Sequence, residues 1–257
     1  MRGPWPERLA GLLAIGLLLA AWEIGCRALA VPAYLLPPPS AVARALVEAA
    51  PRLLPSAGQT FLQAMQALAL AAGVGGAAAV AASLHPAARG AIRPLAVILQ
   101  VTPVVAIAPL VILWVGLDRA QLSVVLLATA VAVFPVFSGA LTGLTSADPD
   151  LERLFDLHGA SAMDRLVRLR LPSSLPFAVE GLRVGAGLAV VGAVVAEFVA
   201  GTGATQGLAW RILEAGNRLR TAELMAGLVW LTLMGLGLNL GVGLVEAAVR
   251  RRFGLAR

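Results

Sequence analysis

The largest concentration of side chains capable of chemistry in this chain is one short charged segment, Asp148 to Pro172. Nine of its 25 residues are charged, whereas charged residues make up only 13% of the whole chain. Apolar residues, among them Leu154, Phe155 and Met163, alternate with these charges. Apolar side chains on a charged, water-exposed helix are typical of a surface that another protein binds. The alternative is an amphipathic helix that lies on lipid headgroups.

Residue types that commonly carry catalysis or bind metals are otherwise scarce. All 20 basic residues are arginine, so the chain has no lysine for a GxxxxGK phosphate-binding loop or for a Schiff base. Cys26 is the only cysteine, and an internal disulfide is therefore impossible. His85 and His158 lie far apart, neither within a long apolar run, and no HExxH or CxxC pattern occurs. We expect this chain to lack ATPase activity, intramembrane protease activity and a metal site.

The composition indicates that these residues belong to an all-α, polytopic membrane protein. Hydrophobic residues make up 59% of the chain, and the mean hydropathy is +0.86. Apolar runs of roughly 20 residues, long enough to cross the hydrocarbon core of a bilayer, recur along the sequence. We predict a single transmembrane domain over residues 1–257 with six spans, at about residues 9–30, 57–83, 92–115, 122–144, 175–200 and 222–249.

The distribution of arginine predicts how these spans are oriented. Six spans place both termini on the same side, and that side carries 12 of the 20 arginines, whereas the opposite side carries seven. Because cytoplasmic loops are enriched in positive charge, we expect the termini and the charged segment to be cytoplasmic. The net charge of +6 then reflects arginines that flank membrane spans rather than a surface that binds nucleic acid.

The charged segment itself predicts two short helices joined by a glycine. The dipeptide Asp148-Pro149 suits the N-cap and the first position of the first helix. Gly159 allows a sharp turn, and Ser161 suits the N-cap of the second helix. The dipeptide Leu171-Pro172 is expected to end that second helix ahead of the fifth span.

A polar break interrupts the third expected span. Gln100, Thr102 and Pro103 lie close together within an otherwise apolar run. A proline frees a backbone carbonyl inside the membrane, which is tolerated where protein or a water-lined cavity satisfies that carbonyl. The break is either a packing kink or part of a translocation pathway, for which these three residues are the candidates.

Glu197, near the outer end of the fifth span, is a further candidate. A glycine-rich sequence follows it, and residues 201–221 are expected to form an external re-entrant or amphipathic segment. A carboxylate buried at this junction needs hydrogen-bond donors, either backbone amides of that segment or an arginine such as Arg211 or Arg218. We expect Glu197 to anchor the segment and hold an outer gate rather than to bind a solute directly.

The charged segment resembles the cytoplasmic EAA loop of permease subunits of bacterial ABC importers. In that pattern a Glu-Ala-Ala triplet precedes a glycine by three residues, and Ile-x-Leu-Pro follows the glycine after nine residues. Here nine residues separate Gly159 from the sequence LRLP, and the sequence RLF occupies the position of the triplet. The sequences LLPPPSAVARAL, PVVAIAPLVILWVGL and VVAEFVAG extend the resemblance over nearly the whole chain, to the nitrate, taurine and sulfonate branch of this family.

The resemblance implies a type I ABC importer permease with six transmembrane helices and a cytoplasmic coupling-helix loop at residues 148–172. Such a permease works as a homodimer or beside a similar permease in the bacterial inner membrane, with two cytosolic ATPase subunits and an extracytoplasmic substrate-binding protein. ATP and magnesium would bind to the ATPases, and this chain would hold no cofactor. The residues implied to contact the ATPase are Glu152, Arg153, Phe155, Asp156, Leu157, His158, Gly159, Ala160 and Met163.

The resemblance leaves the solute open. Sulfonates and nitrate are anions, which favour helix N-termini or arginine, whereas a pyrimidine or flavin precursor of a vitamin favours aromatic stacking. The alternative function is a secondary transporter or channel that acts without an ATPase. Association of the chain with an ATPase distinguishes these two functions.

Overall fold

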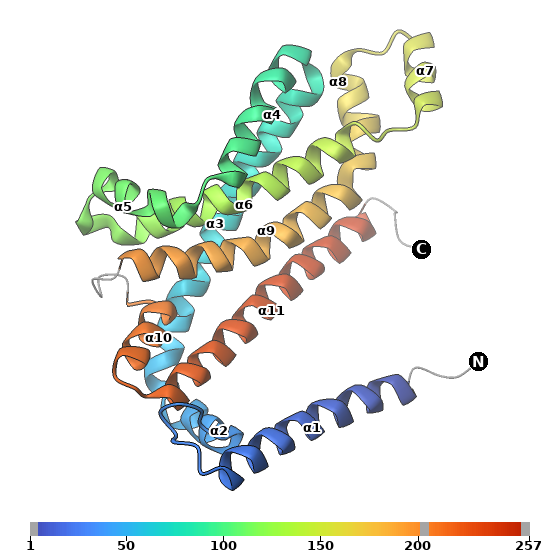
Figure 1. Cartoon of the computed structure of the whole chain (residues 1–257). Helices are drawn as coiled ribbons and strands as arrows, with labels where there is room; N and C mark the ends of the chain where they lie inside the picture. The colour runs from blue at the N-terminus through green and yellow to red at the C-terminus, as the bar shows by residue number, and fades with distance from the viewer. Residues whose placement is uncertain (1–4, 201–205, 253–257) are drawn as a thin grey trace.

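The structure of the chain, a computed structural model, describes residues 5–200 and 206–252. The regular secondary structure of these residues is helical, and no strand occurs among them, as predicted for an all-α protein. The long helices form a bundle, and short helices lie at its two ends (Figure 1). In chain order the helices are α1 (Trp5–Ala28), α2 (Pro39–Glu48), α3 (Ala50–Leu84), α4 (Pro86–Val101), α5 (Val104–Val115), η1 (Leu117–Arg119), α6 (Ala120–Leu144), α7 (Pro149–Leu157), α8 (Ala162–Arg165), η2 (Leu166–Arg170), α9 (Leu171–Ala200), α10 (Leu208–Asn217) and α11 (Thr221–Arg252).

Four helices in the described part of the chain are long and apolar enough to cross a membrane. They are α3, α6, the continuous helix from Ala162 to Ala200, and α11. The bent pair α4 and α5 is a fifth candidate if the two helices count as one span. α1 covers the first predicted span but is not among the four, so the count of six spans remains a prediction.

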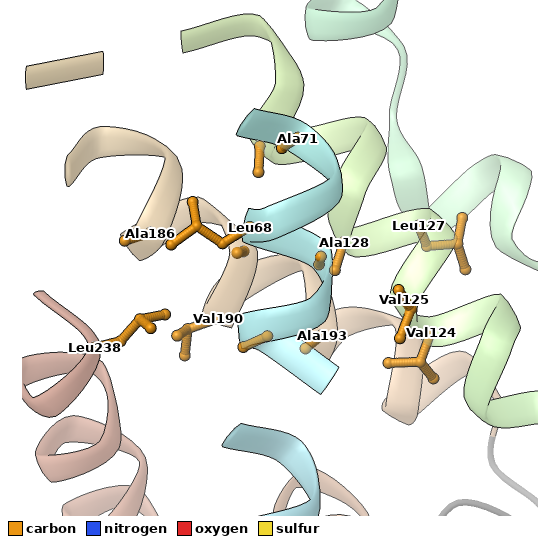
Figure 2. Packing of buried hydrophobic residues seen from close by; sticks show 14 of the residues in the cluster. Leu68, Ala71, Val124, Val125, Leu127, Ala128, Ala186, Val190, Ala193 and Leu238 are labelled. Atoms are coloured by element: carbon orange, nitrogen blue, oxygen red, sulfur yellow. The ribbon is translucent and has the colours of Figure 1, made fainter. Parts of the chain in front are cut away.

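Small residues allow three of these spans to pack closely. α3, α6 and α9 meet along a core rich in alanine, in which Ala71, Ala128 and Ala193 are completely buried (Figure 2). Where α6 crosses α9, a methyl group on Gly181 would lie 2.6 Å from the carbonyl oxygen of Pro135. The absence of a side chain at Gly181 therefore permits this crossing, in the way that small residues commonly let membrane helices approach each other.

The short helices are divided between opposite ends of the molecule. α7 and α8 lie at one end, beside the start of α9, whereas α2 and α10 lie at the other end (Figure 1). α11 runs along α9, and an ion pair of 2.5 Å joins Arg183 of α9 to Glu246 of α11. The charged segment and α10, predicted to face opposite sides of a membrane, are thus separated by the length of the bundle.

The third predicted span, residues 92–115, is broken rather than continuous. α4 ends at Val101 and α5 begins at Val104, and the direction of the chain bends by 102° between the two helices. Thr102 and Pro103 between them have extended backbone conformations. A proline disfavours the helical conformation of the residue before it, which explains why the helix stops at this position.

The predicted helix end at Leu171-Pro172 is wrong. The chain is helical without interruption from Ala162 to Ala200. The segment Leu166–Arg170 is a π-helical turn, in which the amide of Leu171 donates to the carbonyl oxygen of Leu166. A π turn widens the helix directly before Pro172, whose ring otherwise clashes with the carbonyl four residues earlier. The helix therefore accommodates the proline instead of ending at it.

Candidate functional site

The charged segment forms the predicted helical hairpin at one end of the molecule. The Asp148 carboxylate accepts a 2.8 Å hydrogen bond from the amide of Asp150 and so caps α7. Gly159 turns the chain with a φ of +64°, which glycine adopts without strain. The Ser161 hydroxyl accepts a 3.1 Å hydrogen bond from the amide of Asp164 and caps α8. Both predicted caps and the predicted glycine turn are confirmed, and we call residues 148–165 the charged hairpin.

Two ion pairs fasten α7 to the helical segment that follows it. Glu152 lies 2.7 Å from Arg170, and both side chains are largely buried. Arg170 also donates to the carbonyl oxygen of Ser83 at 3.4 Å, which ties this pair to the end of α3. Asp156 lies 2.5 Å from Arg165. The carboxylates of Glu152 and Asp156, predicted to contact a partner, are therefore engaged within the chain, where they fix the direction of α7.

Apolar side chains of the charged hairpin are exposed instead. Leu154, Leu157 and Met163 are 46%, 85% and 61% exposed. Beside them is an open hollow of about 490 Å³, which is lined by Leu154, Phe155, His158, Gly159, Ala160, Asp164 and Arg168. Apolar side chains around a hollow suit a partner that inserts a side chain of its own.

Polar groups in and near this hollow are held in place by bonds within the hairpin. Arg153 is exposed and pairs with the carboxylate three residues earlier at 3.0 Å. Nδ1 of His158 lies 2.8 Å from the backbone carbonyl oxygen four residues earlier, so this nitrogen carries the hydrogen of the bond. The Ser161 hydroxyl, with Arg168 nearby, holds the pKa of the Asp164 carboxyl below its usual range. Asp164 is therefore charged at neutral pH.

The break between α4 and α5 contains two of the three predicted pathway residues. Thr102 and Pro103 form the bend, and Gln100 is exposed on the last turn of α4. The hydroxyl and the amide of Thr102 both donate to the carbonyl oxygen of Ile98, at 2.6 and 3.0 Å. Because Pro103 has no amide, it cannot donate to the carbonyl oxygen four residues earlier, and the helical hydrogen-bond pattern of α4 stops here.

Glu197 is fully buried where α9 meets α3 and α10. Its carboxylate accepts a 2.7 Å hydrogen bond from the hydroxyl of Thr60 and a 3.0 Å hydrogen bond from the amide of Ala209. The amide of Leu208 donates to the same hydroxyl at 2.8 Å, so Thr60 bridges the carboxylate and the first turn of α10. The positive end of the α10 dipole adds to the stabilisation of a carboxylate in this position.

Neither arginine considered as a donor to Glu197 contacts it. Arg211 and Arg218 instead pair with Glu214, at 3.1 and 2.9 Å. Gly207, which precedes α10, lies so close to Glu197 that a methyl group there would overlap the carboxylate. We call the contact of Glu197 with α3 and the first turn of α10 the carboxylate latch.

Two residues that hold these groups, Thr60 and Arg170, were not identified from the sequence. Thr60 is 137 positions from Glu197, and no local pattern links the two residues. The sequence does carry one signal for Thr60, which is a polar side chain within a long apolar helix. A polar side chain that is buried in this way requires a hydrogen-bond partner. Glu152 precedes the turn at Gly159 and Arg170 follows it, so the two residues can pair only because the turn brings the second helical segment back toward α7.

Comparison with known proteins identifies the class to which this arrangement belongs. Residues 69–254 match the family described as binding-protein-dependent transport system inner membrane component. The matched residues include the broken span, the charged hairpin and Glu197. The chain therefore belongs to this family of ABC transporter permeases, which are membrane-embedded transport components rather than ATPases.

Individual relatives are similar over most of their length. The taurine transport system permease protein TauC of Escherichia coli is 30% identical over 248 residues, which cover 93% of this chain and 88% of that protein. The formylaminopyrimidine transport permease protein ThiX of Halalkalibacterium halodurans is 31% identical over 226 residues, 86% of each chain. The riboflavin transport system permease protein RibX of Chloroflexus aurantiacus is 31% identical over 257 residues, 97% of this chain and 92% of that protein.

Proposed function

We propose that this permease forms the solute pathway of an ATP-driven importer together with a second, identical or similar permease subunit. It lies in a bacterial inner membrane with both termini in the cytoplasm. Two cytosolic ATPase subunits supply ATP hydrolysis with bound magnesium, and an extracytoplasmic binding protein delivers the solute. The observation that carries the proposal is the charged hairpin, whose apolar side chains are exposed while its carboxylates Glu152 and Asp156 are paired within the chain.

The exposed surface of the charged hairpin favours a protein partner over lipid headgroups. A helix that lies on a membrane presents one continuous apolar face with charges on the other face. Here Phe155 and His158 line a hollow, and Leu157 between them in the chain is the most exposed leucine among those the structure describes. We propose that Arg153, Phe155, Leu157, His158 and Met163 contact the ATPase, that Gly159 and Ala160 form the turn, and that Glu152 and Asp156 set the direction of α7.

One continuous helix connects the charged hairpin to the carboxylate latch. It spans 39 residues from Ala162 to Ala200, which corresponds to about 58 Å at 1.5 Å per residue. The pair of Glu152 and Arg170 attaches α7 near the start of this helix, and Glu197 lies near its other end. We propose that ATPase movement displaces α7 and that the helix carries this displacement to the latch as a rigid element.

The latch and the broken span are proposed to act at different points of transport. Glu197 holds α10 against α3 and thereby keeps an outer gate closed. The bend at Thr102 and Pro103, with Gln100 beside it, offers polar groups to the solute as it passes between the two permease subunits. Neither role requires chemistry on the solute.

The relatives support a small solute rather than a macromolecule. They are named for the transport of taurine, a formylaminopyrimidine and riboflavin. We therefore propose that the solute is a sulfonate, nitrate, or a vitamin precursor such as a pyrimidine or a flavin.

Co-purification with an ATPase tests the proposal against a secondary transporter or channel that acts alone. Leu157→Asp places a charge in the proposed contact and is expected to weaken ATPase binding by about tenfold or more. Leu219→Asp is the matched control, because Leu219 is 67% exposed and lies beyond α10, at the opposite end of the molecule. Transport by the chain without an ATPase, or an equal loss of binding in the two variants, would contradict the proposal.

A further inference from the structure

A groove between α3 and the start of α6 is lined by glutamine side chains that the mechanism above does not use. Its volume is about 740 Å³. α6 begins at the end of the bundle away from α7 (Figure 1). We call this groove the glutamine groove. Its polar lining residues are Gln59, Gln63, Gln66, Asp118, Arg119 and Gln121.

The glutamines of α3 share one face of that helix. Gln59, Gln63 and Gln66 are four and three positions apart, the spacing that places residues on one side of an α-helix. α3 and α6 lie against each other here, because the Thr129 hydroxyl of α6 is 3.4 Å from the carbonyl oxygen of Ala67. The glutamine face of α3 therefore lines one groove together with η1 and the first turns of α6, where Gln121 is the polar residue.

Gln63 is the residue that indicates a ligand. It is only 4% exposed, and within the described part of the chain neither its amide nitrogen nor its amide oxygen has a hydrogen-bond partner. Buried amides are normally paired, because the loss of their hydrogen bonds to water is unfavourable. Both amide atoms are covered in this conformation, so the Gln63 side chain has to rotate toward the groove, where its unpaired donor and unpaired acceptor offer two hydrogen bonds to a bound molecule.

The charges of the glutamine groove lie at its exposed edge. Asp118 and Arg119 are highly exposed, and the shortest distance between their charged atoms is 3.7 Å. Among the described residues that line the groove, Arg119 is the only cation. The buried part around Gln63 is therefore electrically neutral.

We propose that the glutamine groove is a solute-binding site on the permease itself, and that it takes an uncharged, planar, polar molecule with a hydrogen-bond donor and an acceptor on neighbouring atoms. The inference rests on the proposed function, the import of a small solute. A ring that carries a carboxamide, or an amino group beside a ring nitrogen, forms two parallel hydrogen bonds with the side chain of Gln63. The volume of the groove is in the range of sites for small organic molecules.

An organic anion fits this groove poorly. At the depth of Gln63 an anion gives up its hydration and meets amide donors, and the described lining residues supply no buried positive charge to compensate. The guanidinium of Arg119 is at the edge and is already opposed by Asp118. The groove therefore distinguishes neutral from anionic solutes of the same size.

Protection of a thiol in the groove tests this assignment. The full-length chain carries Cys26→Ser, which removes its only cysteine, and Gln66→Cys, which places a reactive group on an exposed lining position. The rate of modification by a small water-soluble thiol reagent is measured in lipid nanodiscs without an ATPase. Nicotinamide and nicotinate serve as probes because they share ring and size and differ in charge, with cytosine as a second neutral probe and taurine as a sulfonate.

Nicotinamide and cytosine are expected to slow the modification, whereas nicotinate and taurine leave its rate unchanged. Gln63→Leu, added to the same chain, is expected to lower the affinity for nicotinamide about tenfold. The Gln63→Leu substitution removes an unpaired buried amide, so the thermal stability of the chain should stay the same or rise. A lower affinity for nicotinamide would therefore not be a consequence of unfolding. Thr232→Val, which removes an exposed hydroxyl of α11, is the control and should leave protection intact.

Four results would overturn the assignment. Two concern the probes: equal protection by nicotinate, and failure of both neutral probes to protect. The other two are full protection in the Gln63→Leu chain and a thiol at position 66 that never reacts because a second subunit covers the groove. The measurement uses no ATPase, so its outcome is independent of the proposed function. If the probes do not protect the thiol but the permease still binds the ATPase, only the assignment of the groove is rejected. If the probes protect the thiol but the permease does not bind the ATPase, only the proposed function is rejected.

Discussion

Glu197 is a buried carboxylate that joins three helices through two hydrogen bonds. Glu197→Ala leaves the hydroxyl of Thr60 and the amide of Ala209 without this partner, so we expect a loss of about 1–3 kcal/mol in stability. Glu197→Gln keeps the shape and one acceptor oxygen, so its effect should be mild. Uptake of every accepted solute should fall alike in Glu197→Ala, as judged by transport assays alongside thermal unfolding. A change in which solutes are accepted, with the overall rate intact, would make Glu197 a specificity contact instead.

Gly207 provides a second test of the carboxylate latch. A methyl group at this position would overlap the Glu197 carboxylate, so Gly207→Ala should displace α10 and lower both the thermal stability and the transport rate. Gly187→Ala in α9 is the matched control, because no heavy atom lies within 4 Å of an added methyl group there. Alanine also favours a helix over glycine, so the control should be neutral or slightly stabilising. If the two variants had equal thermal stability and equal transport rates, the position of α10 against Glu197 would not matter, which would contradict the proposed role of the latch.

At the scale of elements, the charged hairpin depends on the turn at Gly159. An added methyl group there meets no heavy atom within 4 Å, so the constraint is the φ of +64° rather than space. Gly159→Val should cost about 1–3 kcal/mol of local strain and reduce solute-coupled ATP hydrolysis while the permease still inserts into the membrane. Gly159→Asn is the control, because asparagine tolerates this backbone conformation. Normal coupling in Gly159→Val would count strongly against the hairpin as the element that transmits ATPase movement.

Much of the fold was predictable because apolar length and capping residues act locally. The runs at residues 57–83 and 122–144 are contained in α3 and α6, and Asp148, Gly159 and Ser161 all have their predicted local roles. The angle between α4 and α5 was not predictable, since a proline marks a break but the packing of both helices sets its size. The helix through Pro172 was mispredicted because a π turn depends on the whole helix rather than on the proline alone.

The candidate site was predictable only in part, because the packing of helices that are distant in the sequence brings its residues together. Glu197 was recognisable as a carboxylate that needs donors, but Thr60 comes from a different helix, and only the packing of α3 on α9 and α10 brings them together. The exposed leucines of the charged hairpin followed from its pattern, whereas the pairing of Glu152 with Arg170 followed from tertiary geometry. Gln63 was visible in the sequence, but its burial without a partner is a property of the fold.

At the scale of the whole molecule, the account requires that the charged hairpin and α10 lie on opposite sides of the membrane. Asp150→Cys in a Cys26→Ser chain should react with an impermeant thiol reagent only from the cytoplasmic side, because that side carries 12 of the 20 arginines. Leu219→Cys in the same background should react only from the outside. Labelling of both positions from one side would reject the orientation of α9, which connects the two regions.

The central claim is that the exposed surface of the charged hairpin binds the ATPase, and protection of position 157 tests it most directly. Leu157→Cys in the Cys26→Ser chain is treated with a thiol reagent, alone and with the ATPase subunit that co-purifies with the permease. We predict rapid modification of the permease alone, because Leu157 is 85% exposed, and strongly slowed modification in the complex. The Leu219→Cys control should react at the same rate in both states. An unchanged rate at position 157 in a complex that contains the ATPase would contradict the account.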